Sequence, residues 1–287
     1  MYRLNGLSLR RGTLPILALL CGLVVTSKAS AGSDTSNEPA VEYVPYLSLG
    51  MGVIRSADTR FVDGDDAGHA ALYGSDDRFD AGAVDNGPQV HLAAGVRTPS
   101  GVRVQLEVGL ARSLDYRGNT NYRNSGTRQP AGADLNVCQL FLSGVYDFPG
   151  WELAPGRALR PFVGVGVGLT GYRLTGYVQR FPDPDDPNGY LRRGPGGEAP
   201  FTALPEGRGR NLSAMLTAGI AIPIRERVHL DLTYRYGDAG EISTAVGDIA
   251  IVRYRENGTK REIQVPINET SAELRTHTLL AKFRFGF

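Results

Sequence analysis

The last stretch of the sequence, residues 273–287, carries the pattern that most restricts how the chain can fold. Successive side chains of an extended strand point to opposite faces. Taken in steps of two, one face of this stretch is apolar and carries Leu279, Ala281, Phe283, Phe285 and Phe287. Chain ends are normally frayed and polar. A row of Phe that reaches the terminal residue therefore predicts a final strand whose apolar face meets lipid.

The same alternation recurs along the chain, in segments bounded by Gly, Pro, Asn and Asp. The predicted strands are residues 43–54, 89–97, 102–112, 136–148, 161–172, 211–222, 228–236 and 273–287. The connections between them are alternately long and short, beginning with a long acidic one. Asn257-Gly258, flanked by 249–255 and 261–265, predicts a further hairpin inside the last long connection.

Long and short connections in alternation are typical of membrane barrels, which have short periplasmic turns and long external loops. We therefore predict an all-β, eight-stranded antiparallel up-and-down transmembrane β-barrel over residues 43–287, with four long extracellular loops. A soluble eight-stranded barrel or sandwich is the alternative, but it needs an apolar interior. Here small and charged residues share one face, so the apolar face should lie outside. Leu106, Val165, Leu216 and Leu232 are expected to face lipid.

The start of the chain has the features of a secretory signal peptide. Arg3, Arg10 and Arg11 precede the apolar run 14–25, and the small residues at 29–31 provide a cleavage site. We expect export through residues 1–31, followed by a short periplasmic segment at 32–42. Only Cys138 then remains, so no intrachain disulfide is expected. No later segment has the length of apolar sequence that a membrane helix requires.

Three segments carry a resemblance to a known family. Residues 161–168, 230–236 and 282–287 resemble the fifth, seventh and last strands of small outer-membrane barrels of the OmpA transmembrane, OmpX and opacity-protein type. In this resemblance Phe283, Phe285 and Phe287 correspond to the assembly signal of the closing strand. The resemblance implies a Gram-negative outer membrane, with contacts to its lipid and lipopolysaccharide and to the barrel-assembly machinery. It also implies that the long loops meet any host or extracellular ligand. The sequence stops at the barrel, without the peptidoglycan-binding domain of full-length OmpA, so we do not expect it to be anchored to the cell wall.

Chemistry-bearing motifs are few. Residues 166–171 match a dinucleotide-binding glycine pattern, which requires a following helix that the sequence does not predict. The acidic stretches 63–66 and 76–77 lack the spacing of a calcium loop. The four His have no metal-ligand spacing. We therefore expect no cofactor, no metal and no catalytic residue. A formal charge of +1 gives no indication of nucleic-acid binding.

Charged residues on the inward faces form two predicted layers when strand positions are counted from the periplasmic ends. The central layer contains Glu107, Lys282, His91 and Arg235, and the lower layer contains Arg103, Asp147, Asp231 and Arg284. Unpaired buried charges are costly, so these groups should pair and fill the narrow interior. We expect Glu107 to bond to Lys282, to Arg235 or to both.

These features favour a non-enzymatic surface barrel with a structural or adhesive role exerted through its loops. The first alternative is a small gated pore through the charged layer. The second is a lipid-modifying enzyme, which would need a His with a Ser and an acid at the outer rim. His277 is the candidate His, but its neighbours Thr276 and Thr278 do not supply such a pair. Fold alone does not separate these functions.

Overall fold

A computed structural model describes residues 43–56, 58–63, 78–120, 130–154, 157–181 and 192–287. The expected signal peptide at 1–31 and the periplasmic segment at 32–42 lie outside these residues. In the described part of the chain, no helix is long and apolar enough to cross a membrane. The described secondary structure is β-strand throughout.

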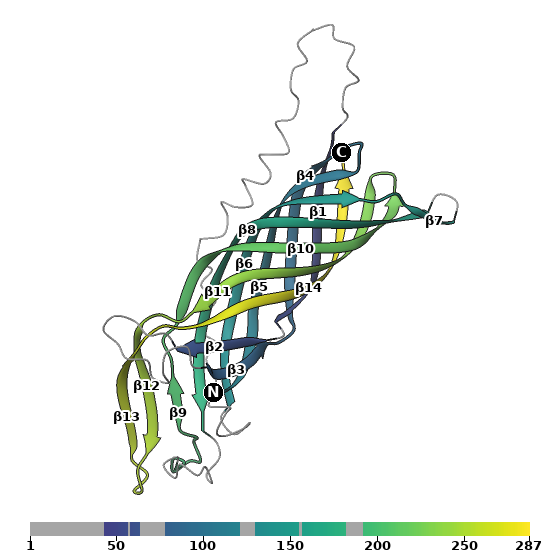
Figure 1. Cartoon of the computed structure of the whole chain (residues 1–287). Helices are drawn as coiled ribbons and strands as arrows, with labels where there is room; N and C mark the ends of the chain where they lie inside the picture. The colour runs from purple at the N-terminus through teal and green to yellow at the C-terminus, as the bar shows by residue number, and fades with distance from the viewer. Residues whose placement is uncertain (1–42, 57, 64–77, 121–129, 155–156, 182–191) are drawn as a thin grey trace, which may run out of the picture.

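Eight long strands form a closed antiparallel ring (Figure 1). They are β1 (Val44–Ser56), β4 (Gly87–Arg97), β5 (Val102–Thr120), β6 (Pro130–Asp147), β8 (Arg157–Arg180), β10 (Gly207–Arg225), β11 (Val228–Ser243) and β14 (Thr270–Gly286). Each pairs with the next along the chain. β14 returns to β1, with Phe283 opposite Leu49, and closes the ring. The predicted eight-stranded up-and-down barrel is confirmed.

Shorter strands extend this ring at both ends. β2 (Thr59–Asp63) and β3 (Arg78–Val84) connect β14 to β5. β9 (Phe201–Ala203), β12 (Gly247–Tyr254) and β13 (Lys260–Ile267) form a small sheet on the edge of β8. β7 (Trp151–Ala154) pairs with β8, and Figure 1 places it at the end of the barrel where the C-terminus lies.

The hairpin predicted around Asn257-Gly258 is present and consists of β12 and β13. Gly258 has a φ of 76°, a left-handed conformation that glycine adopts without steric strain. The Arg255 amide donates to the Thr259 carbonyl oxygen at 3.0 Å and closes the turn. This hairpin projects from the end of the barrel opposite the C-terminus (Figure 1).

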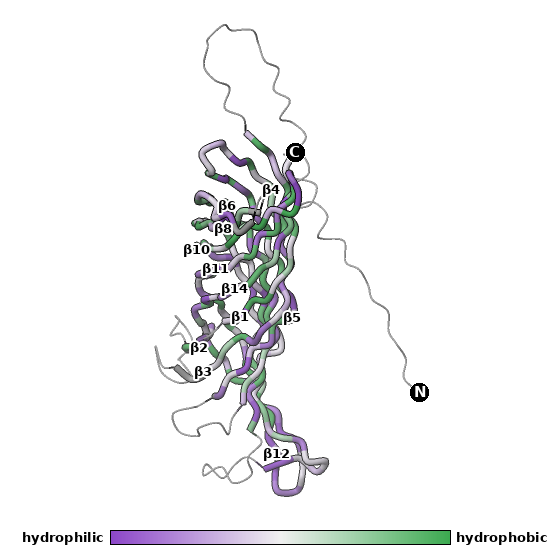
Figure 2. Tube along the Cα trace, turned by 90° about the vertical axis from the view of Figure 1, so that its right-hand side faces the viewer, coloured by the Kyte–Doolittle hydropathy of each residue, from purple (hydrophilic) through white to green (hydrophobic). Residues whose placement is uncertain are grey.

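Side chains alternate across the barrel wall as predicted. The outer face carries exposed apolar residues around most of the ring, among them Met51, Val90, Leu140, Val165, Leu216, Leu232 and Leu279. The inner face of the same segments is polar and buried, with His91, Gln105, Glu107, Ser143, Arg235 and Lys282. Apolar and polar residues therefore alternate along the strands (Figure 2). An apolar exterior around a polar interior is the arrangement of a membrane-spanning barrel.

Several segments predicted as loops are continuations of the strands, which corrects the predicted bounds. β5 runs to Thr120, β8 to Arg180 and β11 to Ser243. In this outer part, which we call the extension, the interior is apolar and the exterior is charged. The extension comprises these strand ends with the adjoining ends of β6, β10 and β14, together with β2, β3, β9, β12 and β13. The prediction missed it because β-bulges, such as the one between Ala111 and Leu114, interrupt the alternation.

One apolar cluster fills the extension. It contains Ile54, Phe61, Val84, Ala111, Leu114, Tyr116, Ala131, Ala133, Leu135, Val137, Tyr172, Leu174, Tyr177, Leu204, Ala239, Ile242, Ile249, Ile267, Ala272 and Leu274. Phe61, Tyr116 and Tyr177 form its aromatic centre, with ring centroids 4.9 to 5.9 Å apart. The extension therefore has a core like that of a water-soluble domain.

Candidate functional site: the charged lumen

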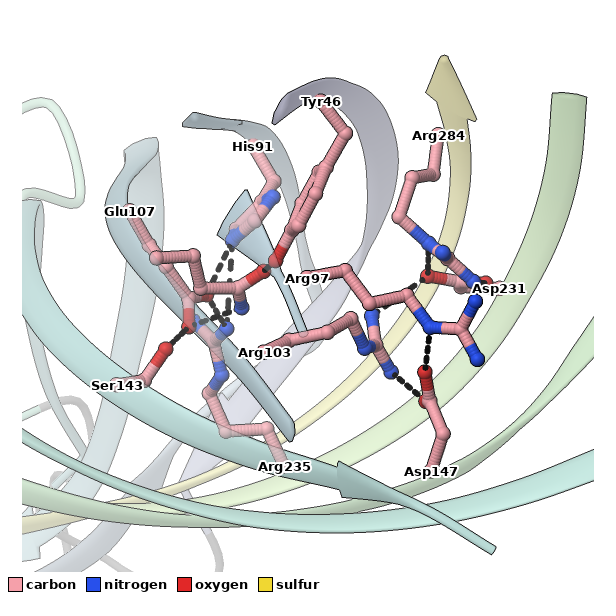
Figure 3. Close-up of polar contacts among 11 residues, drawn as sticks. Tyr46, His91, Arg97, Arg103, Glu107, Ser143, Asp147, Asp231, Arg235 and Arg284 are labelled. Atoms are coloured by element: carbon pink, nitrogen blue, oxygen red, sulfur yellow. Dashed lines mark hydrogen bonds and ion pairs between the residues drawn. The ribbon is translucent and has the colours of Figure 1, made fainter. Parts of the chain in front are cut away.

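Glu107 lies at the centre of the polar interior and is fully buried. Figure 3 shows the groups that converge on its carboxylate. His91 Nε2 lies 2.7 Å from Oε2, and Gln105 Nε2 donates to Oε1 at 2.7 Å. The Ser143 hydroxyl and the Arg235 guanidinium also donate to it. The carboxylate is thus held from β4, β5, β6 and β11 at once, because the pleat directs these residues to the barrel axis.

A second group of charges lies nearer the end of the barrel where the chain terminates (Figure 3). Asp231 accepts from Arg284 Nε at 2.9 Å and from Arg103 Nη1 at 3.3 Å. Arg103 Nη2 lies 2.7 Å from Asp147 Oδ1, and Asp147 also accepts from Arg97 Nε at 3.2 Å. The result is a chain of alternating charges from Arg97 to Arg284. It crosses the lumen between strands on opposite sides of the ring.

Aromatic rings occupy the space beside these charges. The Arg103 guanidinium carbon lies 4.7 Å from the ring centroid of Phe162, and that of Arg235 lies 5.9 Å from Phe141. The Tyr46 hydroxyl donates to Gln105 Oε1 at 2.6 Å. The guanidinium carbon of Arg284 lies 5.7 Å from the ring centroid of Tyr46. A guanidinium is attracted to the face of an aromatic ring, and the attraction is stronger where water is excluded. These contacts add to the interactions that hold Arg103, Arg235 and Arg284 in the lumen.

The structure brings most of the predicted lumen residues together and separates one. Glu107 bonds to Arg235, which is one of the expected arrangements. Lys282 is buried but makes no ion pair within the described residues. It lies directly opposite Asp231 in the register of β11 and β14. Its position on β14 places it beside the lower group of charges as well as near the central one.

Sequence reasoning left Tyr46, Gln105 and Ser143 out of the cluster. Each occupies an inward position of the strand alternation, so the signal was present. Gln105 is two positions from Glu107, and Ser143 is directly opposite Gln105 in the register of β5 and β6. Counting depth alone did not select them, because their side chains carry no charge.

His277 lies on the outer surface, where a lipid-modifying enzyme would need its catalytic His. Its Nδ1 is 2.7 Å from the Tyr234 hydroxyl, and its ring packs edge-on against Tyr236 at 5.4 Å. The nearest outward Ser on the same strand, Ser271, is six positions away, roughly 20 Å along a strand. That distance prevents a hydrogen bond between Ser271 and His277. His277 also lines a surface hollow with Ser271, Asp58, Glu241 and Glu273, but its hydrogen bond in the described residues is to Tyr234.

The remaining motifs do not form a cofactor or metal site in the described residues. The glycine pattern at 166–171 lies inside β8, which continues as a strand to Arg180 where a dinucleotide site would need a helix. The described part of the chain contains no cluster of His, Cys, Asp or Glu suited to a metal ion. The acidic stretch 76–77 lies outside the described residues, and so does the stretch 63–66 apart from Asp63.

The Phe row of the last strand lies on the outer surface. Phe283, Phe285 and Phe287 are all exposed, and Phe285 is opposite Leu47 of β1. The Phe287 amide donates to the Pro45 carbonyl oxygen at 3.0 Å. The terminal residue therefore contributes to the seam that closes the ring.

No protein-family model matches the sequence, and no curated protein matches it. Solved structures with a similar strand arrangement include Neisserial surface protein A (16% identity, 85% of this chain and 96% of that one, TM-score 0.38). OprG from Pseudomonas aeruginosa is 14% identical over 85% of this chain and 98% of its own, with a TM-score of 0.43. The outer membrane protease OmpT from Escherichia coli is 9% identical over 90% of this chain and 99% of its own, with a TM-score of 0.37. Likenesses at this level concern the fold and leave the role of the chain to its own residues.

Proposed function

We propose that this chain is a non-enzymatic outer-membrane surface protein, whose closed barrel presents the extension to ligands outside the cell. The observation that carries the proposal is the apolar core of the extension. In the described part of the chain it contains twenty buried residues, and six of the eight ring strands contribute to it: β1, β5, β6, β8, β11 and β14. This core gives the strands beyond the membrane a fixed shape, and it holds the β12–β13 hairpin through Ile249 and Ile267. A rigid projecting surface suits recognition better than transport.

The interior supports the structural part of the proposal. Ions would have to pass the charges around Asp231, then the carboxylate of Glu107, and then the apolar core. Charge-assisted hydrogen bonds contribute about 1.5–3 kcal/mol each, so simultaneous opening of both charged groups should be rare. In planar bilayers we expect no large steady conductance. A stable open channel of porin size would contradict the closed barrel.

The gated pore remains the second candidate because one observation favours it. Lys282 is a buried cation without an ion pair in the described residues, and it lies between the two charged groups. Exchange of Glu107 from Arg235 to Lys282 would rearrange the central layer. Brief small currents that change in Glu107→Gln would support this candidate.

Surface display of the extension can be tested directly. An epitope inserted between Asn257 and Gly258 should bind antibody on intact cells, because the turn residues are exposed or half-buried. The same epitope inserted between Arg225 and Glu226, at the other end of the barrel, should bind only after the outer membrane is opened. The reverse result would invert the proposed topology.

The recognition role needs a variant that leaves the fold intact. Arg261, Glu262 and Gln264 are exposed on β13, so their replacement with Ala changes the hairpin surface and leaves its backbone pairing. Cells that display this triple variant should attach less to an epithelial monolayer than cells that display the parent protein. Arg225→Gln with Arg227→Gln, at the opposite end, is the matched control. Equal attachment by the triple variant, by a variant lacking 249–265 and by the parent would refute adhesion through this hairpin.

A further inference from the structure

Four arginines gather on the outer surface at the beginning of the extension. Arg112 comes from β5, Arg173 from β8, and Arg208 and Arg210 from β10, and all four are exposed. Arg208 is directly opposite Arg173 in the register of β8 and β10. β6 lies between β5 and β8, with Asn136 opposite Arg173. We call these four residues the arginine patch.

The arginine patch borders the apolar surface of the barrel. Leu212, Leu169 and Leu140 form one row across β10, β8 and β6, and they are 81%, 49% and 40% exposed. Arg210 follows this row at the next outward position of β10, about 7 Å farther along the strand. Arg112 likewise follows the exposed Leu110 on β5. The patch therefore lies where the apolar exterior gives way to the charged one.

The positive charge of the patch is only partly neutralised. Arg173 Nη2 lies 3.3 Å from Glu206 Oε2. Arg112, Arg208 and Arg210 have no ion pair among the described residues. The nearest acids on β5 and β6, Asp115 and Asp134, are opposite each other and farther from the apolar row. Like charges on neighbouring strands, such as Arg208 and Arg173, repel each other unless an anion lies between them.

The surface within the patch is open. Gly171 lies opposite both Arg210 and Cys138. A Cβ placed on Gly171 would have no heavy atom nearer than 3.8 Å. The missing side chain leaves a low area with Arg210 beside it and the leucine row below. An anionic group could approach the guanidinium groups here without displacing protein atoms.

We propose that the arginine patch binds the phosphate groups of an outer-leaflet lipid, whose acyl chains lie on the leucine row. Guanidinium groups match phosphate oxygens in bidentate geometry. The position beside apolar surface favours a phosphate that is attached to hydrocarbon over a free anion. The next strands around the ring differ, because Glu241 and Glu273 are directly opposite each other on β11, the strand beside β10, and on β14. Lipid contact should accordingly be strongest on β5 to β10. This inference is independent of the adhesion proposal.

The test measures binding of lipid A to the folded full-length protein in detergent micelles by native mass spectrometry. Arg208→Gln with Arg210→Gln should weaken binding roughly tenfold or more, through the loss of charge-assisted bonds. The matched control is Arg255→Gln with Arg261→Gln, which removes the same charge from the hairpin and should leave binding unchanged. Circular dichroism checks that both variants fold, as expected for exposed side chains.

Two further arms identify the ligand. Dephosphorylated lipid A should bind the parent protein as weakly as lipid A binds the double variant. Inorganic phosphate at equal ionic strength should fail to displace lipid A. The inference is overturned if the double variant binds like the parent, if dephosphorylated lipid A binds equally well, or if inorganic phosphate displaces the lipid completely. The last result would mean that the patch takes a free anion.

Discussion

The membrane-spanning part of the barrel and the extension use the same strands with opposite patterns. On β5, Leu110 faces outward and Glu107 lies buried in the lumen, whereas farther along the strand Leu114 is buried and Asp115 faces outward. β8 changes in the same way, from exposed Val165 to buried Leu174. The backbone pairing continues across the change. What differs is the surroundings, lipid for one part and water for the other.

This difference indicates how each part is stabilised. In lipid, the exterior side chains gain little from contact with their own chain, so the charged network holds the interior together. In water, burial of apolar surface contributes about 25 cal/mol for each Å² removed from solvent. The extension can therefore have an ordinary hydrophobic core. Substitution of a charged residue should therefore lower the stability more in the lumen than in the extension, and truncation of an apolar side chain should lower it more in the core of the extension than on the lipid-facing surface.

The largest effect is expected in the lumen. Glu107→Ala removes the common acceptor of His91, Gln105, Ser143 and Arg235 and leaves a buried cation without its partner. Breaking a buried pair in this way costs about 3–5 kcal/mol. Urea titration of the barrel folded in lipid vesicles measures the change. Glu206→Ala is the control, because its 3.3 Å pair with Arg173 is exposed and should contribute less than about 1 kcal/mol. Equal losses in both variants would contradict the role assigned to the central network.

The next prediction separates the two parts on a single strand. Leu174→Ala creates a cavity in the core of the extension, where Leu174 is 1% exposed, and should cost about 2–5 kcal/mol. Leu169→Ala makes the same change on the lipid-facing side of β8 and should cost much less. Hydrogen exchange should accelerate in β9 and β12 for the first variant only. Similar behaviour of the two variants would mean that the extension is not held by its core.

Sequence reasoning was successful where the two-residue alternation is uninterrupted. It predicted the ring, the inward and outward faces, and the hairpin at Asn257-Gly258. It missed the extension because bulges shift the alternation by one residue: Ser113 has a φ of 53° and Gly240 one of 74°, next to irregular registers in β5 and β11. In the lumen, depth along the strand brought the right charges together. It could not choose between Arg235 and Lys282, since that choice depends on position around the ring and on side-chain reach.

A third substitution tests which surface meets lipid. Leu106, Val165, Leu216 and Leu232 were expected to face lipid, and the last three are exposed on the outer surface. Leu216→Arg should destabilise the barrel by about 2–4 kcal/mol, because a guanidinium would enter hydrocarbon. Asp134→Arg makes an outward Arg in the extension, opposite Asp115, and should be neutral or slightly stabilising. Folding titrations into vesicles compare the two, and a near-zero effect of Leu216→Arg would refute the assigned boundary.

The smallest equilibrium effect is expected at the seam that closes the ring, at the end farthest from the extension. Deleting Phe287 removes the 3.0 Å hydrogen bond from its amide to Pro45, which contributes about 1 kcal/mol. The finished barrel should therefore be nearly as stable as the parent. If the Phe row acts as an assembly signal, the deletion should still slow the appearance of folded protein in cells severalfold. Pulse-chase labelling with heat-shifted electrophoresis measures that rate. Phe287→Tyr keeps the ring and the hydrogen bond, and should assemble at nearly the parental rate. A deletion variant that assembles at the parental rate would show that Phe287 has only its modest structural role at the seam.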